Sequence, residues 1–151
     1  MDIIMYRDVE MVTQTGRYAL RILGYLADHS GEWVLGRAIA ADTGIPANYL
    51  SKILNQLRKA GFVRSQKGWG GGFLLDGQAT RQPIANVLRL FEGRRDTDSC
   101  VFELRACDAN NPCPLHDRWD RVRQAYGAML NSLSVGDLRH ANKDHQRRES
   151  L

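Results

Sequence analysis

The fold is indicated most clearly by the stretch Thr43-Gly44-Ile45-Pro46-Ala47-Asn48-Tyr49-Leu50-Ser51-Lys52-Ile53-Leu54, which joins two predicted helices. Gly44 ends the helix predicted over 35–43, because glycine readily adopts the left-handed conformation that follows a helix. Pro46 suits the N1 position of the next helix, where its missing N–H costs nothing. That helix is predicted to run to about Ala60. A helix, a glycine-containing turn and a second helix are typical of a helix-turn-helix.

The second helix of this pair has two chemically different faces. An apolar stripe at helical spacing forms one face and consists of Leu50, Ile53, Leu54 and Leu57. The other face is polar and basic, as in helices that enter the major groove of DNA. On this face we expect DNA contacts from Asn48, Tyr49, Ser51 and Lys52. A solvated helical hairpin without DNA binding is the alternative.

A glycine-rich hairpin is predicted directly after this helix. Its strands are expected over 62–65 and 73–75, with the loop Gln66-Lys67-Gly68-Trp69-Gly70-Gly71-Gly72 between them. Such a loop suits a wing whose lysine and backbone amides reach phosphates or the minor groove. The wing residues expected to contact DNA are Lys67, Gly68, Trp69 and Gly70. A hairpin loop without function is the alternative.

The charge balance around these motifs also favours DNA. Between residues 51 and 81 six Lys or Arg residues accompany a single acid, Asp76. A local excess of positive charge of this kind is typical of contact with the phosphate backbone. We therefore expect double-stranded DNA to be a partner of this chain.

The remaining segments complete one domain and an appended helix. Apolar spacing predicts helices from Gln14 to about His29 and over 83–92, with a short strand at 32–34. Residues 1–10 show no clear period and form an N-terminal extension, and residues 11–93 form a winged helix-turn-helix domain. The expected fold class is mainly α with a small β-hairpin wing, followed by a long C-terminal dimerisation helix.

The dimerisation helix is inferred from an apolar seam near the C-terminal end. Its residues recur at spacings of four and three and are Leu115, Trp119, Val122, Tyr126, Met129 and Leu133. A seam of this kind must be covered by its own domain or by a second copy of the chain. We predict a dimerisation helix and a short terminal helix over 115–138, crossing the twin helix in a homodimer and packing on the helix over 14–29. Packing within one chain alone is the alternative, and the polar residues 139–151 predict a disordered tail.

All the cysteines of the chain fall in the segment 94–116, together with a histidine. These four side chains are Cys100, Cys107, Cys113 and His116. Thiolate and imidazole suit zinc or an iron-sulfur cluster, and an odd number of cysteines fits a disulfide framework poorly. We therefore predict a metal-binding or cluster-binding loop over 94–116. The alternatives are buried cysteines without a function, a disulfide switch without metal, and a thiol enzyme, for which no third orienting group is recognisable.

Composition limits the remaining classes. The chain has 151 residues, of which 43% are hydrophobic and 25% charged, and its formal net charge is +4. These values are ordinary for one soluble domain. No apolar run of about 18 residues occurs, and the start of the chain is acidic where a signal peptide needs a basic residue. We expect a cytoplasmic protein that is not an enzyme and has no membrane and no small-molecule substrate as a partner.

Three groups of residues resemble the iron-sulfur-responsive winged-helix regulators, the family that includes IscR and NsrR. They are Thr15-Gly16-Arg17-Tyr18-Ala19-Leu20, Asn48-Tyr49-Leu50-Ser51-Lys52-Ile53-Leu54 and Lys67-Gly68-Trp69-Gly70-Gly71-Gly72-Phe73-Leu74-Leu75. Followed by three cysteines, this order of motifs is specific, and the resemblance covers roughly residues 11–138. It implies a homodimer that binds a pseudo-palindromic DNA operator under the control of an iron-sulfur cluster.

The resemblance also implies which residues hold the cluster. IscR-like members bind a 2Fe-2S cluster through three cysteines and a histidine, which correspond here to Cys100, Cys107, Cys113 and His116. The Cys-x-x-His ending matches, whereas the first gap is one residue longer than in IscR. NsrR-like members with a 4Fe-4S cluster can use an aspartate, whose position here holds Arg17. Asp8 or Glu10 would replace it only if residues 1–10 fold back, so the expected cofactor is a 2Fe-2S cluster, with a 4Fe-4S cluster or zinc as alternatives.

The same resemblance assigns base-reading positions. Asn48 and Ser51 stand where IscR reads bases, and Lys67 stands where IscR has a wing arginine. IscR has a glutamate at the position of Ser51, so the DNA sequence that is read should differ. A lysine ammonium is a point donor and grips guanine less firmly than the planar fork of an arginine.

Overall fold

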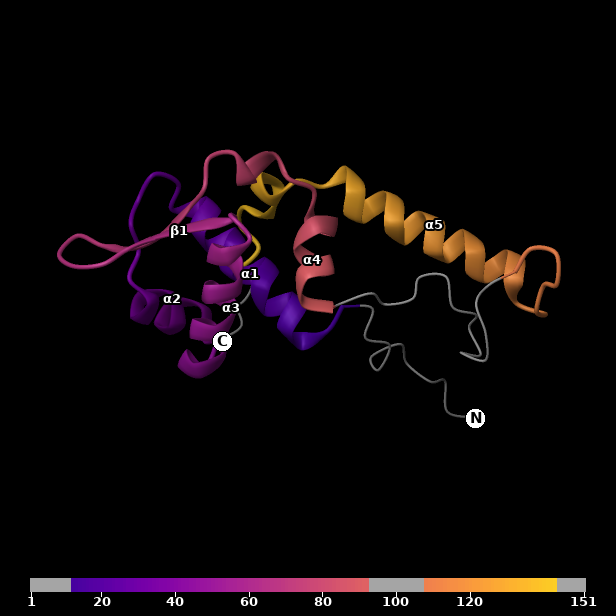
Figure 1. Ribbon diagram of the computed structural model, residues 1–151, viewed down its shortest axis with the longest axis horizontal. Helices are drawn as coiled ribbons and strands as arrows, with labels where there is room; N and C mark the ends of the chain where they lie inside the picture. Colours follow the sequence, from indigo (N-terminus) through magenta and orange to yellow (C-terminus); the bar gives the residue numbers. More distant parts are fainter. Residues whose placement is uncertain (1–11, 93–107, 144–151) are drawn as a thin grey trace.

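The computed structural model describes residues 12–92 and 108–143; the N-terminal extension, the first part of the cysteine segment and the last residues of the predicted tail lie outside these ranges. The elements are α1 (Gln14–Asp28), α2 (Gly36–Thr43), α3 (Ala47–Lys59), β1 (Val63–Gln66), β2 (Gly72–Leu75), the 3-10 helix η2 (Ala79–Arg81), α4 (Ile84–Glu92), α5 (His116–Ser132) and the 3-10 helix η3 (Val135–Leu138). A helical body carries the hairpin at one end and α5 at the other (Figure 1). The predicted fold class, mainly helical with a two-stranded wing, is confirmed. No helix within the two described ranges has the length and apolar composition that crossing a bilayer requires.

Helix α1 forms the centre of the body. The side-chain oxygen of Thr13 accepts a hydrogen bond from the Gly16 N–H at 3.1 Å and so caps the N-terminus of the helix. Ile22, Leu23 and Leu26 are 0–1% exposed, because α2, α3, α4, β2 and η3 all pack around this helix. The predicted helix over 14–29 thus agrees with α1 to within one residue.

The helix-turn-helix consists of α2 and α3, as predicted. Gly44 has φ +71° and its N–H bonds to the carbonyl of Ala40, so it ends α2 in the left-handed conformation. Pro46 corrects the prediction by one position, because it stands before the first helical residue and not at N1. Its ψ of 136° is extended, and its carbonyl accepts the Leu50 N–H at 2.9 Å, which is the role of a residue that precedes a helix. A missing N–H costs nothing there either.

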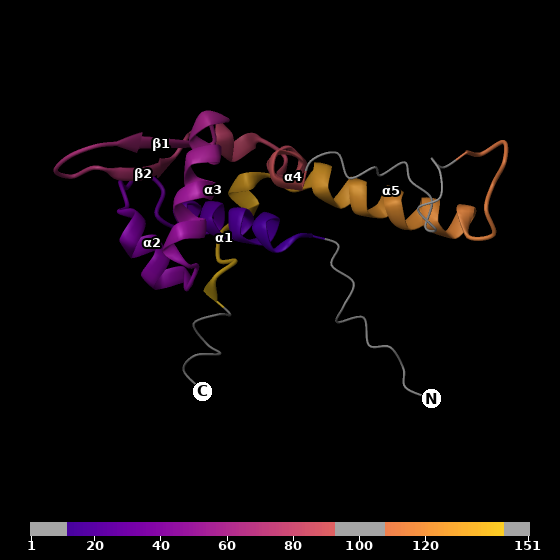
Figure 2. The same cartoon turned by 60° about the horizontal axis from the view of Figure 1, so that its bottom comes forward.

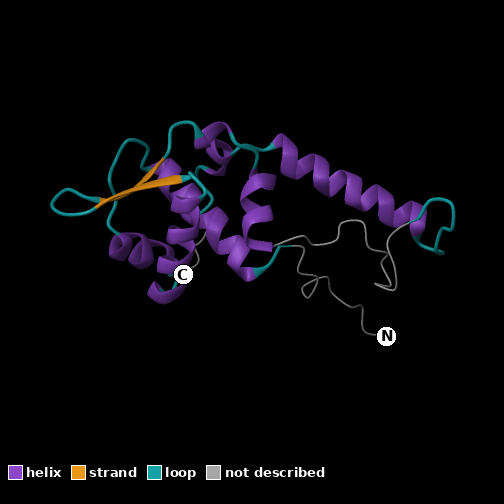
Figure 3. Cartoon of the chain, in the orientation of Figure 1, coloured by secondary structure: helices purple, strands orange, loops and turns teal. Residues whose placement is uncertain are grey.

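The wing is an antiparallel hairpin that is tied to the chain before α2. Val63 pairs with Leu75 and Gln66 with Gly72. The short strand predicted at 32–34 is only a single bridge, in which Val34 and Phe73 exchange hydrogen bonds of 2.9 and 2.7 Å. A Cβ at residue 72 would lie 2.4 Å from the Val34 carbonyl oxygen, so this close approach requires glycine. Figure 3 shows the hairpin projecting beyond the helices.

Helix α5 leaves the body beside α4, and this corrects the expectation that it packs on α1. The Ile84 N–H donates to the Leu133 carbonyl at 2.9 Å, and the Val135 N–H donates to the Gln82 carbonyl at 2.8 Å. These two bonds hold the end of α5 next to the start of α4. The surface of α1 is instead covered by η3, whose Val135 is fully buried.

The first residues of the predicted disordered tail lie on α1, which is a second correction. The His140 N–H donates to the Asp28 carboxylate at 3.0 Å, and the side chain of Asn142 is only 7% exposed. Residues 139–143 find polar partners on the helix and therefore hold a defined position. The prediction for residues 144–151 lies outside the described residues.

Gly24 provides a test of this packing. A Cβ at this position would lie 2.6 Å from the Leu138 carbonyl oxygen. Replacing a glycine inside a helix by alanine normally stabilises a protein by about 0.5–1 kcal/mol. Here we expect Gly24→Ala to lower the free energy of unfolding by about 1–3 kcal/mol, because the new methyl group displaces the segment after η3. Denaturant unfolding of the full chain measures this change.

Gly127 in α5 is the matched control. A Cβ there would meet no atom within 4 Å, so Gly127→Ala should leave stability unchanged or raise it. A Gly24→Ala protein that is as stable as the parent chain would contradict the close contact between α1 and residue 138.

Candidate functional site

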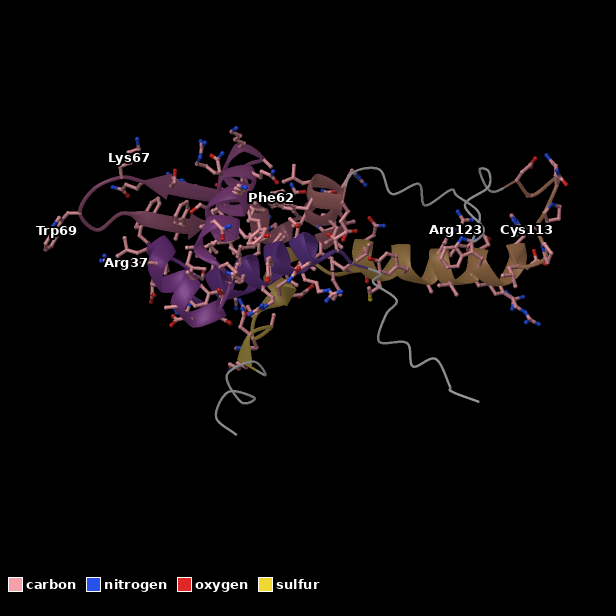
Figure 4. The ribbon with its side chains drawn as sticks, turned by 90° about the horizontal axis from the view of Figure 1, so that it is seen from below. Arg37, Phe62, Lys67, Trp69, Cys113 and Arg123 are labelled. Carbon is pink, nitrogen blue, oxygen red and sulfur yellow. The ribbon has the colours of Figure 1, made fainter. Side chains whose placement is uncertain are left out.

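A groove of about 440 Å³ lies between α2, α3 and the wing. Three cations from three different elements line it: Arg37 from α2, Arg58 from α3 and Lys67 from the wing. Figure 4 shows Arg37 and Lys67 near the base of the hairpin loop. Positive side chains around one depression suit the phosphate groups of a nucleic acid, because phosphate contacts supply most of the affinity in such complexes.

The predicted residues of α3 all face solvent. Asn48, Ser51 and Lys52 are exposed, and Ser51 also lines the groove. Tyr49 is 51% exposed and has a second role, because its ring centroid lies 6.4 Å from that of Tyr18 in α1 at a tilt of 55°. Tyr49 therefore helps to hold α3 on α1 while part of its ring stays open to a partner.

The tip of the wing is a tight glycine turn that exposes a tryptophan. Gly68 and Gly70 have φ of +89° and +70°, and the Gly71 N–H bonds to the Gly68 carbonyl at 3.0 Å. Trp69 is fully exposed, with a relative accessibility of 105%, and points away from the body (Figure 4). An exposed aromatic ring of this kind offers a large surface for contact with a partner.

Sequence reasoning missed Arg37 as a site residue. The available signal was its place on the first helix of the pair, since that helix crosses the DNA backbone in helix-turn-helix complexes. Arg58 belongs to the basic stretch 51–81, but the sequence did not predict it as a DNA-contacting residue. Its guanidinium Nη2 bonds to Asn55 Oδ1 at 2.8 Å, which holds its charge on the groove side of α3.

Helix α2 is held on α1 by a tyrosine that stays neutral. The Tyr25 hydroxyl donates to Asp42 Oδ2 at 2.6 Å. Burial, and next the bond to the Asp42 carboxylate, raise the pKa of Tyr25 well above its ordinary value of 10.0. The hydroxyl is therefore a hydrogen-bond donor to Asp42, and this bond connects α2 to α1.

Of the four predicted metal ligands, Cys113 and His116 are described. They stand at the two ends of the turn Cys113-Pro114-Leu115-His116, in which the His116 N–H donates to the Cys113 carbonyl at 3.0 Å. Both are half-buried, and His116 is the first residue of α5. Cys100 and Cys107 lie outside the described residues. Within those residues no three His, Cys, Asp or Glu side chains come together in a way that could hold a metal ion, so the four-ligand site stays a prediction.

The Cys113–His116 turn lies far from the groove. Figure 4 shows Cys113 at the end of α5 that points away from the wing. Helix α5 has 17 residues, which corresponds to about 25 Å at 1.5 Å per residue. Within the described residues, α5 is the element that joins this turn to the body.

The predicted dimer seam is open to solvent in the single chain. Its exposed members are Leu115, Val122, Met129 and Leu133, with accessibilities of 38–46%. Trp119 and Tyr126 are half-buried, and none of the residues of α5 is fully buried. The row of apolar side chains thus lies along a helix that its own chain leaves largely uncovered.

Comparisons with known proteins agree with this architecture. Residues 12–141 match the family model Rrf2, described as "Iron-dependent Transcriptional regulator". The chain is 30% identical over 128 residues to the HTH-type transcriptional regulator IscR of Yersinia pseudotuberculosis, covering 84% of this chain and 77% of that protein. Among solved structures it resembles CymR, the global cysteine regulator of B. subtilis, with a TM-score of 0.70, 28% identity and coverage of 84% and 94% of the two chains. It also resembles T. potens IscR, with a TM-score of 0.66, 25% identity and coverage of 91% and 90%.

The family match spans most of the chain and includes the helix-turn-helix, the wing and the described part of the cysteine segment. It agrees with the groove lined by basic residues, which suits DNA. The chain belongs to the Rrf2 family of transcriptional regulators.

Proposed function

We propose that this regulator acts as a homodimer whose binding to a pseudo-palindromic operator is controlled by a 2Fe-2S cluster on Cys100, Cys107, Cys113 and His116. The observation that carries the proposal is the place of the Cys113–His116 turn. It leads directly into α5, and the residues that follow α5 are hydrogen-bonded to the DNA-reading body, Leu133 to Ile84 and Val135 to Gln82. A conformational change at the Cys113–His116 turn can therefore be transmitted along α5 to the DNA-reading body.

The groove supplies two kinds of contact with DNA. Arg37 and Lys67 line the groove, and their positive charges suit contacts with phosphates, which position a protein without reading sequence. Asn48 and Ser51 lie on the exposed face of α3, where side chains read base edges in the major groove. An Asn side chain suits adenine, because its amide can bond to both N6 and N7.

Two variants, Arg37→Ala and Asn48→Ala, test the two kinds of contact separately. For Arg37→Ala we expect weaker binding to every duplex tested and a salt dependence whose slope falls by about 1, because one phosphate contact is lost. Asn48→Ala should instead change the preferred sequence, with a loss of about 1–3 kcal/mol on the preferred site alone. Fluorescence anisotropy over a salt series, on preferred and random duplexes, measures both effects.

Arg121→Ala is the charge-matched control, because Arg121 is exposed on α5 and outside the groove. It should leave the salt slope unchanged. An Arg37→Ala protein with the salt slope of the parent would remove Arg37 from the interface.

The dimer is proposed from the apolar seam of α5. Val122 and Met129 are 46% and 45% exposed in the middle of a helix that projects from the body. Covering these side chains with the same seam of a second copy removes apolar area from water, which favours association. Two copies of α3 would then face two half-sites about one helical turn of DNA apart, roughly 10 base pairs.

Val122→Asp tests the dimer. In a two-fold interface the substitution buries carboxylates against an apolar seam, and we expect the dissociation constant of the dimer to rise roughly a hundredfold or more. Sedimentation velocity across a concentration series measures it. Gln124→Asp adds the same charge on the opposite face of α5 and should leave the dimer intact. A Val122→Asp protein that remains fully dimeric would exclude the seam as the interface.

The described part of the metal segment fits a cluster in its donor chemistry. Cys113 supplies a thiol three residues before the start of α5. His116 supplies an imidazole within the same turn, and a neutral imidazole in place of a thiolate leaves a site less negative. When bound, a 2Fe-2S cluster would supply reversible one-electron chemistry and a target for nitric oxide. Redox state, nitric oxide and loss of the cluster are thus the candidate signals.

The chain can convert ligand binding at the turn into a change in DNA affinity. If Cys113 and His116 are held, residues 108–116 take one conformation, and the direction in which α5 leaves them is set. In a dimer joined by α5, that direction sets the distance between the two α3 helices. A change of about 1.4 kcal/mol in binding free energy is enough for a tenfold change in operator affinity.

His116→Ala tests the ligand set. We expect an altered absorption spectrum or redox response in protein purified without oxygen, while the protein without cluster binds DNA as before. His29→Ala, on α1 and outside the segment, is the control and should keep the parental spectrum. An unchanged spectrum and redox response in His116→Ala would remove His116 from the site. Iron and sulfide analysis distinguishes a cluster from zinc, which is colourless.

A thiol switch without metal is the second candidate. It is favoured by the likeness to Staphylococcus aureus CymR, one structure of which is described as the oxidized form, with a TM-score of 0.66 and 25% identity. On protein free of iron and zinc, thiol counts before and after reduction, together with DNA binding in both states, would support this function if both change. Iron and sulfide bound to the purified chain would instead favour the cluster.

A further inference from the structure

Two residues with polar side chains are buried within the described ranges, and Arg21 is hydrogen-bonded to the side chain of one and the backbone carbonyl of the other. Thr43 is 0% exposed at the end of α2, and Asn142 is 7% exposed after η3. Arg21 of α1 bonds to both of these residues. Buried polar groups need partners, so this arrangement constrains all three residues at once.

The side chain of Asn142 makes two hydrogen bonds with Arg21, which lies 121 positions earlier in the chain. Its Oδ1 accepts a hydrogen bond from Arg21 Nε at 3.1 Å, and its Nδ2 donates to the Arg21 backbone carbonyl at 2.9 Å. The first bond fixes the direction of the guanidinium, and the second fixes the amide against α1. Asn142 thus determines where the rest of the Arg21 side chain points.

Arg21 in turn holds the turn before α3. Its Nη2 donates to the backbone carbonyl of Thr43, one of the last carbonyls of α2, which have no partner inside the helix. Thr43 Oγ1 donates to the Ile39 carbonyl at 2.6 Å and accepts the Ile45 N–H at 3.4 Å. The turn is therefore bonded to α2 from within and to α1 through Arg21. Since α3 begins two residues after Ile45, the position of this turn sets the position of α3.

The segment that carries Asn142 is anchored at two further points. Residues 138–143, here called the strap, pass Gly24 so closely that a Cβ there would lie 2.6 Å from the Leu138 carbonyl oxygen. The strap then bonds through the His140 N–H to the Asp28 carboxylate at 3.0 Å. Arg21, Gly24 and Asp28 lie on one face of α1. Figure 2 shows the yellow strap passing across α1.

We propose that Arg21 and Asn142 are positioning residues for DNA reading, through which the strap holds α3 at the angle that fits base edges. Neither residue lines the groove. They act on α3 through the Thr43 carbonyl, so they influence base reading without touching DNA. The strap follows α5 and η3 directly, so a movement of α5 has a path to α3. The inference rests on DNA reading by the family and needs no cluster.

The experiment uses the full chain purified without oxygen and a duplex selected by that chain from a randomised pool. The dissociation constants for the selected duplex and for a random duplex are measured for Asn142→Ala, Arg21→Ala and the double variant. We expect the selectivity ratio of Asn142→Ala to fall about tenfold, which corresponds to roughly 1.4 kcal/mol. Binding to the random duplex should stay within about twofold, because the phosphate contacts are untouched. The double variant should be no less selective than Arg21→Ala alone, because Asn142 acts through Arg21.

Asn86→Ala is the control, because Asn86 lies on α4 and its Nδ2 donates to the nearby Gln82 Oε1 at 2.7 Å. It should leave the selectivity ratio unchanged. An unchanged ratio in Asn142→Ala, an equal loss on both duplexes, or effects that multiply in the double variant would each overturn the proposal. If Asn142→Ala does not fold, Asn142→Asp replaces it, because it keeps an oxygen for Arg21 Nε while a carboxylate oxygen takes the place of the amide donor to the Arg21 carbonyl. A folded Asn142→Asp protein should lose about threefold in the ratio, and no loss would likewise overturn the proposal.

Discussion

The burial of α1 is the constraint on which the rest of the structure depends. Ile22, Leu23 and Leu26 are removed from water on a helix that packs against α2, α3, α4, β2 and η3. Because protein interiors are close-packed, a helix surrounded in this way allows little independent movement of its neighbours. The helix-turn-helix, the wing and the strap therefore have defined positions relative to one another, which a DNA reader needs.

The distance between the DNA groove and the Cys113–His116 turn shapes the regulatory model. The groove lies at one end of the molecule, and the turn begins the helix that projects from the other end (Figure 4). A signal at the turn cannot reach the groove by direct contact. The two proposals above each provide a route, namely the spacing of two α3 helices across the proposed dimer and the proposed path from α5 through the strap to Arg21. Both routes require α5 to move as one unit together with the residues that follow it, which are hydrogen-bonded to Gln82 and Ile84.

The likeness to both IscR and CymR suits a modular design. One DNA-reading body, with the groove between α2, α3 and the wing, can serve different signals if the sensing groups sit on the segment before α5. The chemistry of that segment then decides the signal. In this chain the segment ends in Cys113 and His116, a soft thiol and an imidazole, which is why the cluster proposal is favoured over a purely thiol-based one.

The amino-acid sequence alone determined the helices of the body, the helix-turn-helix and the wing. These features arise from local causes: apolar residues at helical spacing in α3, the left-handed Gly44, and the glycines around Trp69. The exposed face of α3 could be predicted for the same reason, because Leu50, Ile53 and their neighbours leave only one face for solvent. Local spacing also predicted α5, but not the surface on which it would pack.

Only the tertiary structure decided the contacts between residues that are far apart in the chain. The pairing of residues 82–84 with 133–135 places the end of α5 beside α4 and not on α1. The hydrogen bond between Arg21 and Asn142 joins residues 121 positions apart. Arg37 joined Arg58 and Lys67 in one groove only when α2, α3 and the wing were brought together. The spacing of apolar residues along the sequence does not predict such contacts, because they depend on which surfaces meet after the local elements have formed. For that reason the polar residues 139–143, which suggested a disordered tail, proved to be part of the folded body.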